Sequence, residues 1–195
     1  MWHMPNGTTI DSRPYRWPWH RRFTPARTAL LVAVDGTVAP PGAATATRLL
    51  EVVRAAAVSG VTIGELPDAS GATVVPAALR DFAVARPHFG GFSGTDLDSV
   101  LRRRGITDLM LAGFPFELGA DCTMRQANDL GYECLALTDC CTGLAPDTLA
   151  GAISSIQMSG GIFGAVAEST AVLELFASAH VVATAPATPS RGVNA

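Results

Sequence analysis

The chain has 195 residues, of which 48% are hydrophobic and 16% are charged, so it can bury a sizeable core and is not expected to be disordered as a whole. Fourteen basic and 17 acidic residues give a net charge of −3, which argues against a nucleic-acid partner. All the basic residues are arginine, and the lack of lysine excludes a P-loop and any Schiff-base mechanism within this chain.

The chain is predicted to have three parts. Residues 1–28 are polar and aromatic with no clear period, and they are expected to form an extended N-terminal arm. Trp17 and Trp19 would be costly to leave in water, so the arm should dock on the body of the protein or on a neighbouring subunit. Residues 29–177 form the predicted domain, and residues 178–195, which are small, polar and proline-containing, form a predicted flexible tail.

Within the predicted domain, short apolar runs alternate with segments of helical periodicity. The predicted strands cover 29–35, 61–67, 80–86, 106–113, 132–139 and 161–166. The predicted helices cover 44–60, 95–105, 119–130, 147–159 and 169–177. This alternation predicts an α/β fold, a three-layer sandwich in which a mostly parallel sheet carries helices on both faces.

The cysteines and histidines do not indicate a metal site. The four cysteines form no CxxC pair and the four histidines lie far apart, so no metal and no cofactor is expected. The first residues do not resemble a signal peptide, and no apolar run reaches the roughly 18 residues of a membrane span. We therefore expect a cytoplasmic protein with reduced thiols and no membrane partner.

Ligands of doubly wound sheets bind beyond the carboxyl ends of the strands, which draws attention to three segments. Asp35 ends the first predicted strand and is either a general acid or base, or a turn residue. Arg86 ends the third, where a surface arginine is the default interpretation. Gly119, in the turn 113–122, precedes a predicted helix whose free N–H groups suit an anion or oxyanion, although it also suits a simple tight turn.

Several segments carry a resemblance to a known family. MRQANDLGYECLALTDCCTG (124–143) and MSGGIFGAVAES (158–169), together with 11–35 and 92–106, resemble the isochorismatase-like cysteine hydrolases. Within that superfamily the chain looks most similar to the biuret-hydrolase-type amidohydrolases. The resemblance covers most of residues 11–177, and it implies a Rossmann-like three-layer fold and oligomers whose sites lie close to subunit contacts.

The resemblance also implies roles for single residues. The family hydrolyses non-peptide C–N bonds with an aspartate, a lysine and a cysteine, whose thiol attacks the carbonyl from a helix N-terminus. Carried over by position, the aspartate is Asp35, the lysine position holds Arg86 and the cysteine position holds Gly119. Phe114, Pro115 and Phe116, in the turn that resembles the family's cis-peptide turn at Phe114–Pro115, are the expected substrate-binding residues.

The chain thus departs from the family's pattern in its chemistry. Glycine has no side chain with which to attack, and arginine does not replace lysine cleanly. The segment 68–78, which carries pocket loops in relatives, is short, and Cys122 lies about one helical turn beyond Gly119, away from the helix N-terminus. These losses predict a degenerate catalytic triad and a pseudoenzyme that serves as a structural or regulatory subunit, either as a homo-oligomer or as a hetero-oligomer with an active relative.

Two other functions remain open from the sequence. True isochorismatases also resemble this fold, carry glycine at the nucleophile position and cleave a vinyl ether by acid catalysis. In an enzyme of altered chemistry, acting on an amide, a ureide or a vinyl ether, Asp35 would be the general acid and Arg86 would bind substrate carboxylates. Alternatively, the chain binds a small ureide or carboxylate at the turn 113–119 without cleaving it.

Overall fold

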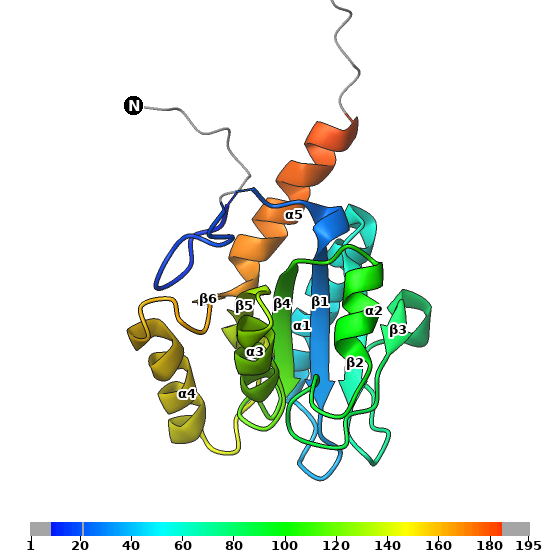
Figure 1. Ribbon diagram of the computed structural model, residues 1–195, viewed down its shortest axis with the longest axis vertical. Helices are drawn as coiled ribbons and strands as arrows, with labels where there is room; N and C mark the ends of the chain where they lie inside the picture. The colour runs from blue at the N-terminus through cyan, green and yellow to red at the C-terminus, as the bar shows by residue number, and fades with distance from the viewer. Residues whose placement is uncertain (1–8, 21, 185–195) are drawn as a thin grey trace, which may run out of the picture.

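The computed structural model describes residues 9–20 and 22–184, which form a three-layer α/β structure (Figure 1). A six-stranded sheet has the strand order β3-β2-β1-β4-β5-β6, and its strands pair in parallel throughout. The strands are β1 (Thr28–Val34), β2 (Thr62–Pro67), β3 (Phe82–Ala83), β4 (Asp108–Phe114), β5 (Glu133–Leu137) and β6 (Ala165–Ala167). The predicted fold class is therefore confirmed.

Five α-helices cover the two faces of the sheet (Figure 1). They are α1 (Ala43–Ser59), α2 (Leu97–Arg103), α3 (Ala120–Asp129), α4 (Pro146–Met158) and α5 (Ser169–Thr184). Helices α1 and α5 pack together on one face, while α2, α3 and α4 lie on the other. From β1 the chain passes through α1 to β2 on one side, and from β4 it passes through α3 and α4 to β5 and β6 on the other side. Right-handed crossovers therefore place α1 on the opposite face from α3 and α4.

The central strands form the core. Every residue of β1 (TALLVAV) and of β4 (DLMLAGF) is buried, as expected for strands that helices cover on both sides. Their near-continuous apolar runs are the reason that the sequence predicted both strands to within two residues at each end.

The two edge strands are shorter than predicted. The segment predicted as a strand over 80–86 has regular strand structure only at Phe82–Ala83, although the backbone N–H groups of Val84 and Arg86 still donate to β2 at 3.0 and 2.9 Å. The segment predicted over 161–166 begins its strand at Ala165 instead. Gly160, Gly161 and Gly164 adopt positive φ angles of 68°, 102° and 112°, a backbone conformation that favours glycine and forms a loop here.

The last helix is longer than predicted. Helix α5 continues to Thr184, beyond residue 177, where the sequence predicted its end and the start of the flexible tail. Residues 178–184 contain neither glycine nor proline, and alanine supports helix continuation until Pro186 approaches. The remainder of the predicted tail, 185–195, lies outside the described residues, as do residues 1–8 of the predicted arm.

The described part of the N-terminal arm docks on its own chain. Arg13 and Val166 exchange two backbone hydrogen bonds of 3.0 and 2.7 Å, which pair the arm with the edge strand β6. Trp17 is completely buried and packs on Phe23, with 6.4 Å between ring centroids. Trp19, in contrast, is 69% exposed, so only one of the two tryptophans drives the docking seen here.

Among the described helices, each is either too short or too polar to span a bilayer.

Replacing Trp17 by alanine should lower the free energy of unfolding by about 3–5 kcal/mol, because it removes a large, fully buried aromatic side chain and leaves a cavity. The matched control is Trp19→Ala, which should cost less than about 1 kcal/mol because its side chain is mostly exposed. Urea unfolding followed by circular dichroism measures both values. Similar losses for the two variants would contradict the docking of the arm through Trp17.

Candidate functional site

The candidate site lies at the carboxyl end of the sheet, where the strand order reverses between β1 and β4. Asp35 directly follows β1, and its backbone N–H donates to the carbonyl of Phe114 at 2.9 Å, which joins it to the turn after β4. Arg86 reaches the same region from the segment after β3, and its Nη2 lies 3.6 Å from the point where a Cβ on Gly119 would stand. The fold therefore brings the three sequence-predicted catalytic positions together.

The carboxylate of Asp35 is held by a local turn. Asp35 is 8% exposed, and its Oδ1 accepts hydrogen bonds from the backbone N–H of Thr37 at 2.9 Å and from the Thr37 hydroxyl at 2.5 Å. Such a bond from a residue two positions ahead is the ordinary role of an aspartate that begins a turn. One oxygen is thus committed to local structure, which fits the turn-residue alternative as well as a site role.

Arg86 is a cross-link between backbone segments. It is 2% exposed, and it forms no ion pair with a described carboxylate. Its guanidinium donates instead to five backbone carbonyl oxygens. Two are on strands, Val34 of β1 at 2.9 Å and Leu66 of β2 at 3.1 Å, and three are in loops, His88 at 3.1 Å, Phe89 at 2.9 Å and Leu118 at 3.3 Å. The default interpretation of Arg86 as a surface arginine is therefore wrong, because its side chain is almost completely buried and is bonded to backbone carbonyls.

Burial lowers the pKa of the Arg86 guanidinium, while the nearby carboxylates of Asp35 and Asp68 act in the opposite direction. Arginine stays protonated in proteins in spite of such burial, so the charge is present but is surrounded by carbonyl oxygens. A planar guanidinium can donate in several directions at once, and a lysine ammonium cannot reproduce that pattern.

Gly119 precedes α3 and has no room for a side chain. A Cβ built on Gly119 would lie 2.7 Å from the Cβ of Ala33 on β1, closer than such atoms approach in proteins. The Ala33 methyl group is fixed to the backbone of the central strand and cannot rotate away. A cysteine at position 119 would therefore require α3 or β1 to shift.

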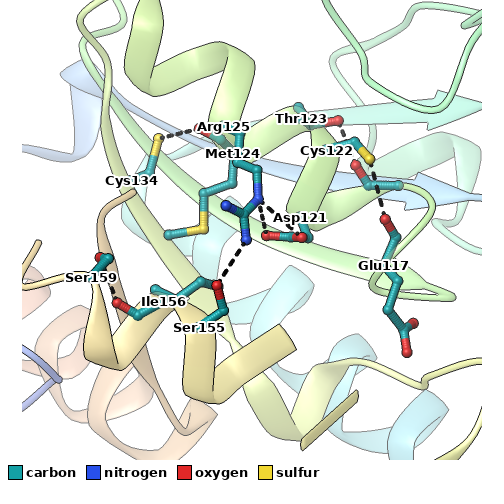
Figure 2. Close-up of polar contacts among 11 residues, drawn as sticks. Glu117, Asp121, Cys122, Thr123, Met124, Arg125, Cys134, Ser155, Ile156 and Ser159 are labelled. Carbon is teal, nitrogen blue, oxygen red and sulfur yellow. Dashed lines mark hydrogen bonds and ion pairs between the residues drawn. The ribbon is translucent and has the colours of Figure 1, made fainter. Parts of the chain in front are cut away.

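Cys122 lies on α3, and its thiol is turned back toward the preceding turn (Figure 2). Its Sγ donates to the carbonyl of Glu117 at 3.2 Å. Burial and the Asp121 carboxylate raise the pKa of the Cys122 thiol, and Arg125 and Arg86 offset this only in part. Asp121 is itself paired with Arg125 at 3.0 Å. The thiol is therefore not activated as a nucleophile.

The turn after β4 belongs to the core. Phe114, Pro115 and Phe116 are all buried, and the Phe114–Pro115 peptide is cis, as the resemblance implied. The backbone N–H of Phe116 donates to the carbonyl of Thr142 at 2.7 Å, and the N–H of Thr142 donates to Gly113 at 3.3 Å. These bonds fix the turn against the segment that follows β5. The substrate-binding role of the three residues stays a prediction.

A cavity of about 270 Å³ opens beside Asp35. Its lining consists of residues from the ends of β1 and β2 and from the segment after β3, namely Asp35, Asp68, Ala69, Arg86, Pro87, His88 and Phe89. Neither Gly119 nor the buried turn after β4 contributes to this lining. The acidic and basic positions of the predicted triad therefore share a cavity that the nucleophile position does not reach.

Asp68, the second carboxylate of this cavity, is not among the residues predicted from the sequence. Its Oδ1 accepts hydrogen bonds from the backbone N–H groups of Gly36 at 3.3 Å and Ser70 at 3.2 Å, and from the Ser70 hydroxyl at 2.5 Å. Burial works against ionisation, but these bonds outweigh it and lower the pKa of Asp68. Asp68 follows β2 as Asp35 follows β1, so the rule about strand ends was sufficient to find it.

The short segment 68–78 leaves this cavity open because it is anchored elsewhere. Glu65, completely buried on β2, accepts hydrogen bonds from the backbone N–H groups of Val74 at 2.5 Å and Val75 at 2.9 Å. Arg80 forms an ion pair with the other oxygen of Glu65. The segment is thereby held against β2, and only its first residues line the cavity.

The described residues contain no group of three histidine, cysteine or carboxylate side chains able to hold a metal ion.

The fold and the site together define a protein class. Residues 44–170, more than half of the chain, match the Isochorismatase domain, and the chain belongs to the isochorismatase family. It is similar to the uncharacterized isochorismatase family protein YwoC of Bacillus subtilis, with 44% identity over 59 residues that cover 30% of this chain and 31% of that protein. It is also similar to the ureidoacrylate amidohydrolase RutB of Acinetobacter baylyi, with 36% identity over 67 residues, 34% of this chain and 27% of that protein. The matched segments thus span about a third of the length of these curated relatives.

Solved structures show the same fold. The cysteine hydrolase from Pseudomonas syringae pv. phaseolicola superposes with a TM-score of 0.70 at 21% identity, covering 84% of this chain and 97% of that one. The nicotinamidase from Staphylococcus aureus gives a TM-score of 0.63 at 19% identity, covering 72% and 99%. At these identities the likeness concerns the fold alone.

Replacing Arg86 by lysine should lower the free energy of unfolding by roughly 2–4 kcal/mol, because several buried carbonyl groups lose their donor. Arg54→Lys, on the exposed side of α1, is the matched control and should change it by less than about 0.5 kcal/mol. Chemical denaturation measures the difference. A lysine variant as stable as the original chain would contradict the role of Arg86 as a cross-link.

Cys122 in the folded chain should react with iodoacetamide more slowly than a free thiol at about pH 7.5, because its raised pKa leaves a smaller thiolate fraction. The same shift means that the rate should keep rising with pH beyond the range in which a free thiol is already ionised. Mass spectrometry measures the alkylation of the chain, and Cys122→Ser is the control that identifies the signal from Cys122. A rate that levels off near neutral pH would indicate an activated thiolate and contradict this account.

Proposed function

We propose that this chain is a non-catalytic member of the isochorismatase family that serves as a structural or regulatory subunit. The observation that carries the proposal is the close approach of Gly119 to Ala33, at 2.7 Å for a Cβ on the glycine. The position that would hold the nucleophile has neither a reactive side chain nor the space for one. Thiol attack on a carbonyl has no starting point there.

The hydrogen bonding of Arg86 is the second observation that supports the proposal. A lysine at this position would offer its charge to the reacting groups, whereas the Arg86 guanidinium donates to backbone carbonyls of three segments. The cation is thus part of the framework. Restoring a thiol alone would not restore the charge that the family's reaction uses.

Cys122 does not replace the missing nucleophile. Its thiol is hydrogen-bonded to the Glu117 carbonyl, and its pKa is raised (Figure 2). A chain with an intact core and no activated thiol is suited to a scaffold role. In that role it would self-associate, or it would pair with an active relative that supplies its own lysine and cysteine.

A second candidate function is ligand binding without cleavage, which the cavity beside Asp35 favours. Asp35 and Asp68 both line it, and each carboxylate has one oxygen committed to neighbouring N–H and hydroxyl groups. The other oxygens are available to a ligand that carries N–H groups. A ureide, the type of compound named in the ureidoacrylate amidohydrolases similar to this chain, has such groups.

The proposal is tested by assaying ammonia release from a panel of ureides and amides, and cleavage of isochorismate. The original chain should show no turnover on any of them, since no nucleophile is in place. An active family amidohydrolase serves as the positive control, and Asp35→Asn as the matched negative control that reveals contaminating activity. Turnover by the original chain that Asp35→Asn abolishes would contradict the proposal and favour a hydrolase in which Asp35 is the general acid.

Two further variants distinguish the possible reasons for an absence of turnover. Gly119→Cys should be destabilised by its contact with Ala33, and Ala33→Gly in the same chain should relieve that contact. Calorimetric titration with the same ureides tests the second candidate. Saturable binding to the original chain that Asp68→Asn weakens would support a ligand-binding role.

A further inference from the structure

A second cavity lies at the opposite end of the sheet, where the strands begin. It has a volume of about 630 Å³ and is formed where the arm crosses the starts of β1, β4 and β5. The parallel register places Thr28, Asp108 and Glu133 side by side at this edge. Figure 1 shows the arm at the upper end of the molecule, while the strands point toward the candidate site at the lower end. The two cavities are therefore separated by the length of the sheet.

Asp108 gives this cavity a buried acceptor. The residue is 1% exposed, and its Oδ1 lies 2.9 Å from Nε2 of His20 on the arm. The Thr107 hydroxyl is near and favours the ionised carboxylate, yet neither Asp108 Oδ2 nor Thr107 Oγ1 has a hydrogen-bond partner of ordinary geometry in the part of the chain described. A buried carboxylate oxygen without a donor is unfavourable, so this atom is suited to a donor from a ligand.

Two arginines line the same cavity. Arg22 and Arg27 are both exposed, and neither forms an ion pair or a side-chain hydrogen bond with another described residue. The other carboxylate of the lining, Glu133, is already engaged, because it accepts hydrogen bonds from the Tyr15 hydroxyl at 2.8 Å and from the backbone N–H of Trp19 at 3.0 Å. The cavity thus combines one buried carboxylate, whose Oδ2 has no partner of ordinary geometry among the described residues, with two exposed cations.

We propose that this cavity binds a small zwitterion of the amino-acid type. The ammonium group donates to Asp108 Oδ2, and the carboxylate is held by Arg22 and Arg27. The guanidinium fork matches a carboxylate, and the cavity volume is within the roughly 300–1,000 Å³ typical of small-molecule sites. This binding needs neither Asp35 nor Gly119, so it is independent of the function proposed above.

Thermal unfolding of the full chain tests the proposal with glycine, β-alanine and 4-aminobutyrate, three zwitterions of increasing charge separation. Acetate and ethylammonium at the same ionic strength are the single-charge controls. At least one zwitterion should raise the Tm saturably by about 2 °C or more, and the two controls together should not, because only the zwitterion engages both ends of the cavity. A panel in which no zwitterion exceeds the controls would overturn the proposal.

Variants then locate the binding. Arg27→Gln should weaken the binding of the active zwitterion about tenfold, as expected for the loss of a charged hydrogen bond. Arg54→Gln, which removes an equally exposed arginine on α1, should leave it unchanged. Asp108→Asn should abolish the Tm shift, and if that buried variant does not fold, the Arg27→Gln comparison decides alone. Equal affinity of Arg27→Gln and the original chain would overturn the proposed site.

Discussion

The guanidinium of Arg86 is the constraint on which the carboxyl end of this sheet depends. It joins carbonyl groups at the end of β1, at the end of β2 and in the turn before α3, where Val34, Leu66 and Leu118 lie. Burying a cation is costly unless its N–H groups are satisfied, and here carbonyl dipoles satisfy them with no ion-paired carboxylate among the described residues. Asp35, the adjoining cavity and Gly119 all lie next to this guanidinium.

This arrangement shows how the family fold can use a buried cation as part of its framework. The Arg86 guanidinium also donates to the carbonyls of His88 and Phe89, so it holds neighbouring loops together. Gly119 lies close to Ala33, and Phe114, Pro115 and Phe116 of the preceding turn pack in the core. The cavity beside Asp35 presents the carboxylates of Asp35 and Asp68, which can accept hydrogen bonds.

The buried charges at the two ends of the sheet differ in how fully they are hydrogen-bonded. At the carboxyl end, Arg86 has partners on several sides. At the amino end, Asp108 has His20 on one oxygen and no partner of ordinary geometry on the other among the described residues. Burial raises the pKa of Asp108, and His20 and Arg27 offset this only in part. The arm contributes to that end directly, since Trp17 anchors it in the core and His20 follows three residues later.

The sequence by itself determined the α/β fold, the central strands and the positions Asp35, Arg86 and Gly119, because long apolar runs and distinctive segments are local properties of the chain. It also indicated the cis peptide at Phe114–Pro115 through its family resemblance. Only the tertiary structure decided that Arg86 and Trp17 are buried while Trp19 is exposed. It also decided that Asp68 lines the same cavity as Asp35, and that Asp108 lines a cavity under the arm. These features depend on contacts between segments far apart in the sequence, and the burial and hydrogen bonding of a side chain are fixed only when those segments meet.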